Sequence, residues 1–276
     1  MVHRILIVTA VAAEADSVAA GLGHDARNAP RDTVREPAWE PVPLPGGLTL
    51  RRHADGVDLL VGGVGPAAVA AATGTALACA SLAGAGSCSG SGAPYDLVVS
   101  AGIAGGFAPH APLGTVVVSD AIVAADLGAE TPDGYLAVEE LGFGRSAHPV
   151  PHSLTEPLAA ALRAGGLPHA VAPVLTVSTV TGTAGRAAEL AGRHPTAAAE
   201  AMEGFGVAEA SAAYGVPVVE IRAVSNAVGP RDRAAWRIGE ALDALKKAFA
   251  LLAPPLLTPP AGPARLPNPT PSVEAK

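Results

Sequence analysis

The chain alternates between short, continuous apolar runs and segments in which apolar residues recur every three or four positions. A continuous apolar run predicts a strand that is buried on both faces, and apolar residues at helical spacing predict an amphipathic helix. These patterns predict strands at residues 5–11, 48–52, 57–61, 96–101, 113–124, 172–180 and 218–226. They predict helices at about residues 14–22, 67–83, 158–164, 184–193, 207–214 and 233–253.

Strands and helices alternate along the whole chain, which indicates the fold class. We expect an α/β protein, with one three-layer domain in which helices flank a central mixed, mainly parallel sheet. The domain is expected to span residues 1–253. Residues 24–47 are polar and rich in Arg and Pro, so we expect an irregular insertion there. Residues 254–276 are rich in proline, which predicts a disordered tail.

The first apolar run allows two interpretations. Residues 1–13 resemble a short signal peptide with an Ala-rich cleavage site, whereas residues 5–11 alone resemble a buried strand. The positive region is minimal, and Glu14 and Asp16 follow at once on an amphipathic segment, which favours the strand. No apolar run reaches the length of a membrane-spanning helix, so no membrane partner is expected.

Composition narrows the class of protein. Of the 276 residues, 49% are hydrophobic and 3% are aromatic, which suits a sizeable core built from small side chains. The net charge is −7 and there is no basic run, so nucleic acid is not expected as a partner. The two cysteines, Cys79 and Cys88, lack the spacing of a disulfide or metal motif, and we expect a cytoplasmic protein without a metal.

Two polar side chains lie where predicted apolar segments begin or end. Glu203 opens a predicted helix within a run of small, apolar residues, and Asn226 closes a predicted strand. In an α/β protein the carboxyl ends of strands and the nearby helix starts face the ligand crevice, so both side chains can point into one pocket. Position alone also suits Asn226 as a turn residue, Glu14 as a solvated residue of a first helical turn, and Trp236 as a core residue.

Two glycine-rich segments each follow a predicted strand. Residues 63–68 match a variant of the dinucleotide-binding fingerprint, but no acidic residue lies about 20 positions further on, which favours an ordinary strand-to-helix turn. Residues 102–106 are expected to form a second turn, whose backbone can approach a ligand closely. That turn lacks a Lys followed by Ser or Thr, so it is no P-loop. Residues 125–149 are expected to form a loop.

Taken in order, the motifs resemble those of the nucleoside phosphorylase superfamily, and specifically its 5′-methylthioadenosine nucleosidase branch. The matching stretches are residues 5–14, 63–65, 100–106, 114–120, 202–204 and 222–226. Within that superfamily, residues 176–183 and 225–231, followed by Trp236, resemble the futalosine hydrolases. That family removes hypoxanthine from futalosine in the alternative menaquinone pathway.

The resemblance implies a purine nucleoside as the small-molecule substrate and a hydrolytic site without cofactor or metal. An N-glycosidic bond breaks through a state with positive charge on the sugar and negative charge on the leaving base. Glu14 stands where the family has the general base that activates water. Glu203 would accept hydrogen bonds from the ribose hydroxyls, with Met202 packed on the sugar.

The resemblance also assigns the base pocket. Thr179 and Val180 align with the family's base-binding backbone. Trp236 aligns with an aromatic residue that packs on the base or closes the pocket, although core packing explains it equally well. The backbone turn expected to line the site comprises Ile103, Ala104 and Gly105.

Asn226 stands where methylthioadenosine nucleosidases have an Asp, and together with Glu14 it is a candidate catalytic residue. An Asn amide can donate to a carbonyl O6 and accept a proton from N7, whereas an Asp carboxylate is repelled by the carbonyl. Asn226 therefore predicts a 6-oxopurine rather than adenine. An amide cannot act as a general acid, so water or a protonated purine must serve instead.

Two other functions are alternatives. A methylthioadenosine/S-adenosylhomocysteine nucleosidase is disfavoured by Asn226, and a non-catalytic nucleoside-binding module is disfavoured by the retention of both Glu14 and Glu203. The Gly-Asp-Pro-x-Arg phosphate loop of many phosphorylases is absent after the first strand, which favours water over phosphate as the nucleophile.

The resemblance implies a homo-oligomer, since homodimers are common in the family. It leaves open how the large carboxylated 5′ group of futalosine would be recognised. The candidates, chosen because they are basic and lie in predicted loops, are Arg145, His148 and Arg231.

Overall fold

The computed structural model describes residues 3–23, 39–84 and 94–258. Their central sheet has the strand order β10-β7-β12-β13-β5-β1-β4-β3-β2, with β14 paired to β5 and β6, and β11 paired to β6. Its strands are β1 (Ile5–Thr9), β2 (Glu40–Pro43), β3 (Thr49–Arg52), β4 (Val57–Val61), β5 (Leu97–Gly106), β6 (Val116–Val118), β7 (Ala121–Ala124), β10 (Ala147–Pro149), β11 (His169–Val171), β12 (Val174–Thr176), β13 (Ala199–Ala201) and β14 (Val218–Ala227). A separate hairpin consists of β8 (Gly128–Thr131) and β9 (Gly134–Ala137).

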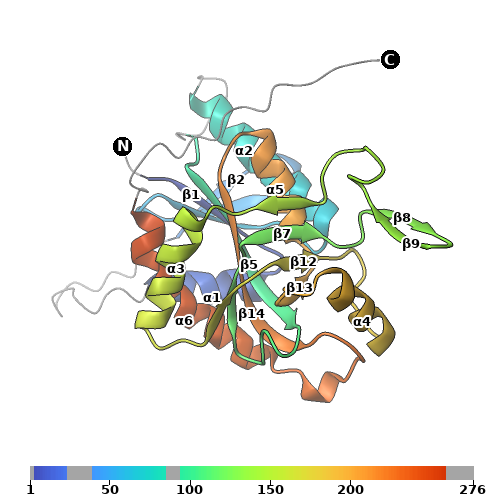
Figure 1. The fold of residues 1–276 in the computed structure, drawn as a ribbon. Coiled ribbons are helices and arrows are strands. Elements are labelled where there is room, and N and C mark those ends of the chain that lie inside the picture. The colour runs from blue at the N-terminus through green and yellow to red at the C-terminus, as the bar shows by residue number, and fades with distance from the viewer. Residues whose placement is uncertain (1–2, 24–38, 85–93, 259–276) are drawn as a thin grey trace, which may run out of the picture.

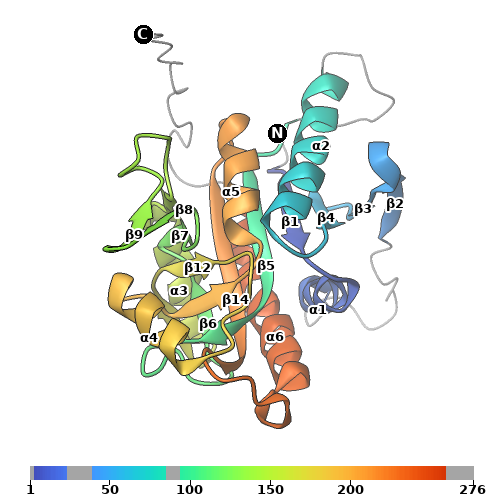
Figure 2. The ribbon, with the colours of Figure 1, turned by 90° about the vertical axis from the view of Figure 1, so that its right-hand side faces the viewer.

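Helices cover both faces of this sheet (Figure 1). They are α1 (Ala12–Leu22), α2 (Pro66–Gly84), α3 (His152–Ala164), α4 (Ala184–Arg193), α5 (Gly204–Ala213) and α6 (Ile238–Leu257). On one face α6 packs against both α1 and α3, and on the other α2 packs against α5 (Figure 2). The three-layer α/β prediction is therefore confirmed.

The first strand shows why its sequence is apolar throughout. Ile5 and Ile7 belong to the core that contains residues of α1 and α6, whereas Leu6 and Val8 belong to the core that contains residues of α2. Successive side chains of a strand point to opposite faces, and here both faces are covered. An alternating pattern would have left one of the two helical layers without a partner.

The two longest strands, β5 and β14, run parallel through the middle of the sheet. Their pairing extends from Val218 opposite Val98 to Ala227 opposite Gly106, with a register shift between Val224 and Asn226. The predicted turn at residues 102–106 is therefore wrong, because the strand continues through these glycines.

The predicted insertion at residues 24–47 is partly regular. Residues 40–43 form β2, which pairs antiparallel with β3 at the edge of the sheet, and Pro45–Gly47 form a short 3₁₀ helix. Proline is tolerated in an edge strand because one side of that strand has no partner to receive an N–H. Residues 24–38 lie outside the described residues.

Three predicted boundaries in the middle of the chain are wrong as well. The run at 113–124 forms two strands, because β6 pairs with β14 and β11 whereas β7 pairs with β12 and β10. The predicted loop at 125–149 contains β8, β9 and β10. The predicted strand at 172–180 is reduced to β12, after which the N–H of Ser178 binds the carboxylate of Asp126 (2.6 Å) and the chain leaves the sheet.

The expected domain boundary at residue 253 falls inside α6, which continues to Leu257 and includes Pro254 and Pro255. Leu252 and Leu256, four positions apart on one face of the helix, are both buried. Their burial accounts for the extra turn, so the start of the predicted tail belongs to the fold. Residues 259–276 lie outside the described part of the chain. None of the helices that the structure describes is both long and apolar enough to cross a membrane.

Candidate active site

Glu14 is buried in the first turn of α1, directly after β1, and only 4% of its surface is exposed. Its Oε2 accepts hydrogen bonds from the N–H groups of Ala10 (3.0 Å) and Val11 (3.3 Å). Its Oε1 accepts one from the N–H of Ile103 on β5 (2.9 Å), a residue 89 positions away. The alternative of a solvated helix residue is therefore wrong, because the sheet brings a distant donor to this carboxylate.

Arg222 on β14 is fully buried, and its guanidinium is held from several directions. Its Nε donates to Oε1 of Glu220 (2.8 Å), and its Nη2 donates to the hydroxyl of Ser100 on β5 (3.2 Å). Its Nη1 lies 3.1 Å from Oε2 of Glu203 in an ion pair. The planar fork of an arginine allows these partners to bind at separate edges of one group.

Glycine at two positions makes this arrangement possible. A Cβ at Gly102 would lie 2.5 Å from Oε1 of Glu14 and 2.6 Å from Nη1 of Arg222. A Cβ at Gly204 would overlap the carboxylate of Glu220. The glycines therefore leave room for buried charged groups to lie directly against the backbone, which is the role of the motif at residues 102–106 that the prediction of a turn missed.

The cluster of Glu14, Glu203, Glu220 and Arg222 holds three carboxyl groups and one guanidinium, all shielded from water. Burial raises the pKa of Glu14, and Arg222 and the N–H of Ile103 offset only part of the rise. Burial also raises the pKa of Glu220, whose Oε2 has no hydrogen-bond partner in the described parts of the chain. Burial lowers the pKa of Arg222, but the three carboxyl groups raise it by more than burial lowers it, so the guanidinium stays charged.

Glu203 lies immediately before α5, as predicted, and is 6% exposed. Its Oε1 accepts a hydrogen bond from the N–H of Gly65 (3.3 Å), and its Oε2 faces Arg222. The glycine-rich turn before α2 therefore contributes a donor to the same site. The neighbouring Met202 is half-buried.

Asn226 lies at the register shift near the carboxyl end of β14. Its Oδ1 accepts a hydrogen bond from the hydroxyl of Ser225 (2.8 Å), and its Nδ2 donates to the carbonyl of Ala227 (3.0 Å). A Cβ at Gly105 would lie 3.3 Å from Nδ2. The amide is thus oriented by its neighbours but keeps a second N–H and a second lone pair for a ligand.

The loop after β12 carries Thr179 and Val180, which are both exposed. It is anchored at Thr181, whose N–H donates to Oε1 of Glu200 (2.9 Å) and whose hydroxyl donates to Oε2. Glu200 on β13 stands opposite Gly105 of β5, and so does Asn226 on β14. The sheet therefore places the anchored end of this loop and Asn226 on either side of Gly105.

The sequence prediction missed Ser100 and Glu220, which hold Arg222, and Glu200, which anchors Thr181. Glu200 is the single charge of its apolar strand, and Glu220 and Arg222 are two charges within an otherwise mostly apolar strand, a contrast that is a signal that could have identified them. Ser100 carries no such signal. No cluster of His, Cys, Asp and Glu side chains within the described ranges is arranged to hold a metal ion.

Known proteins resemble this chain over most of its length. The family model described as the phosphorylase superfamily matches residues 5–256. The chain belongs to the phosphorylase superfamily. It is 58% identical to the futalosine hydrolase of Streptomyces coelicolor, over 92% of this chain and 96% of that protein, and 44% identical to that of Acidothermus cellulolyticus, over 90% and 89%. The solved futalosine hydrolase of Helicobacter pylori has the same fold, with a TM-score of 0.71 at 15% identity over 92% of this chain and 99% of that one.

Within this superfamily fold, Trp236 is half-buried in the segment between β14 and α6. The guanidinium carbons of Arg231 and Arg233 lie 5.4 Å and 5.9 Å from the centre of its ring. The N–H of Arg237 donates to the carbonyl of Ser225 (2.8 Å), which ties the segment to the end of β14 beside Asn226. Trp236 thus has two arginines within cation–π range, and its segment is tied to the end of β14.

The structure separates the three basic candidates for the 5′ group. His148 and Arg145 both face Glu209 on α5, with nitrogen–oxygen distances of 2.6 Å and 3.7 Å. Burial lowers the pKa of His148, although its bond to Glu209 opposes that effect. Arg231 instead joins Trp236 and the loop after β12, so the three residues do not form one binding site.

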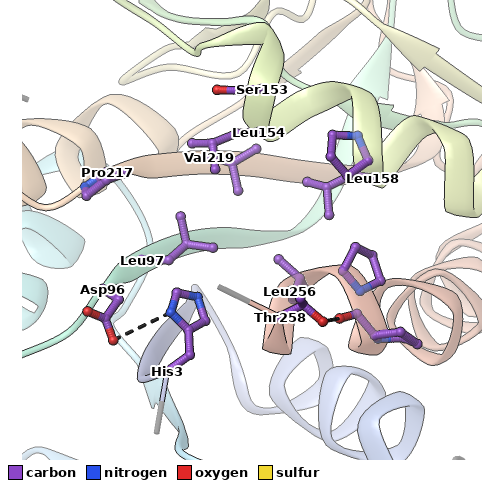
Figure 3. Close-up of a pocket in the computed structure, with 13 residues that line it drawn as sticks. His3, Asp96, Leu97, Ser153, Leu154, Leu158, Pro217, Val219, Leu256 and Thr258 are labelled. Atoms are coloured by element: carbon purple, nitrogen blue, oxygen red, sulfur yellow. Dashed lines mark hydrogen bonds and ion pairs between the residues drawn. The ribbon is translucent and has the colours of Figure 1, made fainter. Parts of the chain in front are cut away.

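A separate cavity of about 450 Å³ lies at the amino ends of β5 and β14, opposite the ends that carry Asn226 and Gly105. Figure 3 shows Leu97, Val219 and Leu158 on its walls, with the pair of His3 and Asp96 (3.5 Å) at one side. The cluster around Arg222 lies farther along β5 and β14, so this cavity does not include it.

We predict that Arg222→Met lowers the free energy of unfolding by about 3–5 kcal/mol, because it leaves buried carboxylates without a counter-charge. Ser100→Ala, which removes one hydrogen bond from the same guanidinium, is the control and should cost about 1 kcal/mol. Urea unfolding measures both values. The deficit of Arg222→Met should shrink at acidic pH, where the carboxylates take up protons in the folded state. A stability within 1 kcal/mol of the parent protein at neutral pH would contradict this account.

Proposed function

We propose that this protein is an N-glycosidase that hydrolyses futalosine to hypoxanthine and dehypoxanthine futalosine, in the alternative menaquinone pathway. One observation carries the choice of substrate: the 58% identity to a futalosine hydrolase over 92% of this chain. The geometry supports the chemistry, because Glu14 after β1 is bound by the N–H of Ile103 on β5, Glu203 before α5 is paired with Arg222 on β14, and the amide of Asn226 near the end of β14 is oriented by Ser225. No cofactor or metal enters the proposal.

Glu14 is the proposed general base. The bond between C1′ of the ribose and N9 of the purine breaks, the electron pair leaves with the purine, and water attacks the cationic sugar while Glu14 accepts its proton. A positioned base contributes about 10²–10⁴ to the rate. Glu14 and Glu203 also place negative charge beside the developing cation in a site without bulk water, where electrostatic stabilisation is strong.

Glu203 is the proposed ribose ligand. Arg222 and the N–H groups of Gly65 and Met202 hold its carboxylate, and its remaining accepting capacity would serve the ribose hydroxyls. Met202, next along the chain, would pack on the sugar. With Glu203 binding the ribose, the remaining lone pair of Glu14 can accept a hydrogen bond from the water.

Asn226 is the proposed reader of the purine, together with the backbone of Thr179 and Val180 and the ring of Trp236. Its second N–H suits the carbonyl O6 of hypoxanthine, and its second lone pair suits a proton on N7. Because the amide cannot release a proton, the leaving purine takes its proton from water. The strand residues Ile103, Ala104 and Gly105 of β5 complete the proposed lining of the pocket.

Water is the proposed nucleophile for a structural reason as well. The N–H groups of Ala10 and Val11, which follow β1, donate to Glu14. They are therefore not presented to a phosphate ion. A phosphorylase would need donors at this turn, and the chain also lacks the Gly-Asp-Pro-x-Arg sequence there.

The alternatives are weaker. An Asp in the place of Asn226 would suit the amino group of adenine, so the amide argues against a methylthioadenosine nucleosidase. A binding module would not need a buried base that takes up three backbone N–H groups. A homodimer in the cytoplasm belongs to the same proposal, and sedimentation equilibrium of the pure protein should give twice the monomer mass.

The direct test is to incubate the pure protein with futalosine and with methylthioadenosine, with and without phosphate, and to measure the free base. We expect rapid release of hypoxanthine from futalosine without phosphate, and little release of adenine. Asn226→Asp should shift the preference toward the adenine nucleoside, because a carboxylate accepts from the 6-amino group. Faster adenine release by the parent protein would exclude the 6-oxopurine assignment, and a requirement for phosphate would exclude hydrolysis.

Glu14→Gln should lower kcat by about 10²–10⁴, because the amide cannot accept the proton from water. Burial raises the pKa of Glu14, and only its ionised form is a base, so kcat/KM of the parent protein should fall with decreasing pH at a higher pH than for an ordinary glutamate. The residual activity of Glu14→Gln should not show this fall of kcat/KM with decreasing pH. Glu130→Gln, an exposed change on β8, is the control. An unchanged rate in Glu14→Gln would remove the assigned base.

A further inference from the structure

The charges of the candidate site are unevenly distributed. Glu14, Glu203 and Glu220 gather around a single arginine, which suits a substrate that becomes cationic at the sugar. The whole chain carries a net charge of −7. A substrate with a carboxylate elsewhere in the molecule would therefore be repelled unless a positive group lies where that carboxylate binds.

A positive group of this kind lies in the segment after β14. Arg231 and Arg233 are both exposed, and both guanidiniums lie within about 6 Å of the centre of the Trp236 ring, the range of a cation–π contact. Neither forms an ion pair with an acidic side chain of the described chain. The intervening Asp232 instead accepts a hydrogen bond from the N–H of Ala234 (3.1 Å). We refer to Arg231, Arg233 and Trp236 as the rim cluster.

Two contacts fix the rim cluster beside the site. The stem of Arg231 packs against the loop after β12, because a Cβ at Gly182 would lie 3.5 Å from its Cγ and 3.6 Å from its Cδ. The N–H of Arg237, next to Trp236, donates to the carbonyl of Ser225, which precedes Asn226. The cluster therefore spans the two elements that are proposed to hold the purine.

Other arginines of the protein differ from the rim cluster. Arg237 lies 3.7 Å from Glu240, Arg186 lies 2.7 Å from Glu189, and Arg163 lies 3.7 Å from Glu156. Their charges are already balanced by a neighbour. In the rim cluster the aromatic ring orients the guanidiniums while their N–H edges keep no acidic partner, an arrangement that suits an external anion.

We propose that the rim cluster binds a carboxylate at the 5′ end of the nucleoside substrate, and so determines which nucleosides this enzyme accepts. The inference rests on the proposed function for the identity of the ribose and purine sites. Arg231 and Arg233 donate N–H groups to the carboxylate, and Trp236 holds the two guanidiniums in place. The carboxylates of Glu14 and Glu203 then face the sugar, and the rim cluster binds the carboxylate at the 5′ end of the substrate.

The test compares futalosine with its methyl ester, which carries one additional methyl group and no charge on the carboxyl group. The parent protein should show a KM about 10–100-fold higher for the ester, since hydrogen bonds between charged groups are lost. In the double variant Arg231→Gln/Arg233→Gln, the acid and the ester should have the same KM. The KM for futalosine should also rise with ionic strength in the parent protein and change little in the variant, because salt screens exposed charges. Arg163→Gln, at an exposed arginine of α3, is the control and should keep the difference between acid and ester.

Three results would overturn the proposal. Equal KM values for acid and ester in the parent protein would show that the carboxylate is not recognised. An equal loss for acid and ester in the double variant would show that the arginines serve the purine loop instead. If futalosine is not cleaved at all, the proposed function fails, and calorimetric titration with dehypoxanthine futalosine and its methyl ester tests the rim cluster separately. Equal binding of the two, or no binding, would then exclude it.

Discussion

The burial of the Arg222 guanidinium is the constraint on which the centre of this protein depends. A charge without access to water is tolerated only when its N–H groups find partners and its charge finds a counter-charge. The partners come from β5, from β14 itself and from the residue before α5, so the arginine joins segments that are far apart in the sequence. A lysine has no planar fork and could not bind Glu220, Glu203 and Ser100 at separate edges.

The same burial gives the site its electrical character. One guanidinium faces three carboxyl groups, and burial raises the pKa of Glu14 and of Glu220. Burial disfavours the charged form of both carboxyl groups, and the positive charge of Arg222 offsets part of that effect. A site prepared in this way stabilises a cationic sugar without any rearrangement at the moment of reaction. Structural stability and the proposed chemistry therefore depend on one set of contacts.

The sequence predicts the fold class and the elements with strong local signals, such as the apolar run of β1, the strand β14 and the helix at 184–193. It fails where the outcome depends on distant partners. The run at 113–124 splits because its halves pair with different strands, and β5 continues through its glycines because β14 pairs with them. Position alone also suggested a solvated Glu14, because the N–H of Ile103 that makes its burial possible is 89 positions away. Glu203 stood out as a charge within a run of small, apolar residues, and Glu14 was assigned by family resemblance. Glu220 lies in no matching stretch, and Ser100, which opens the matching stretch 100–106, was given no role, although both orient Arg222.

In the proposed function, the choice of purine by Asn226 depends on the backbone as well as on the side chain. The register shift in β14 leaves Ser225 buried and Asn226 half-buried beside it. A bulge of this kind changes the direction of the side chains that follow it. Ser225 and the carbonyl of Ala227 then each take up one half of the amide, so that its remaining donor and acceptor have defined directions. Without the shift, an asparagine at this position would alternate faces with its neighbours as in a regular strand, and the amide would not be held by the same two groups.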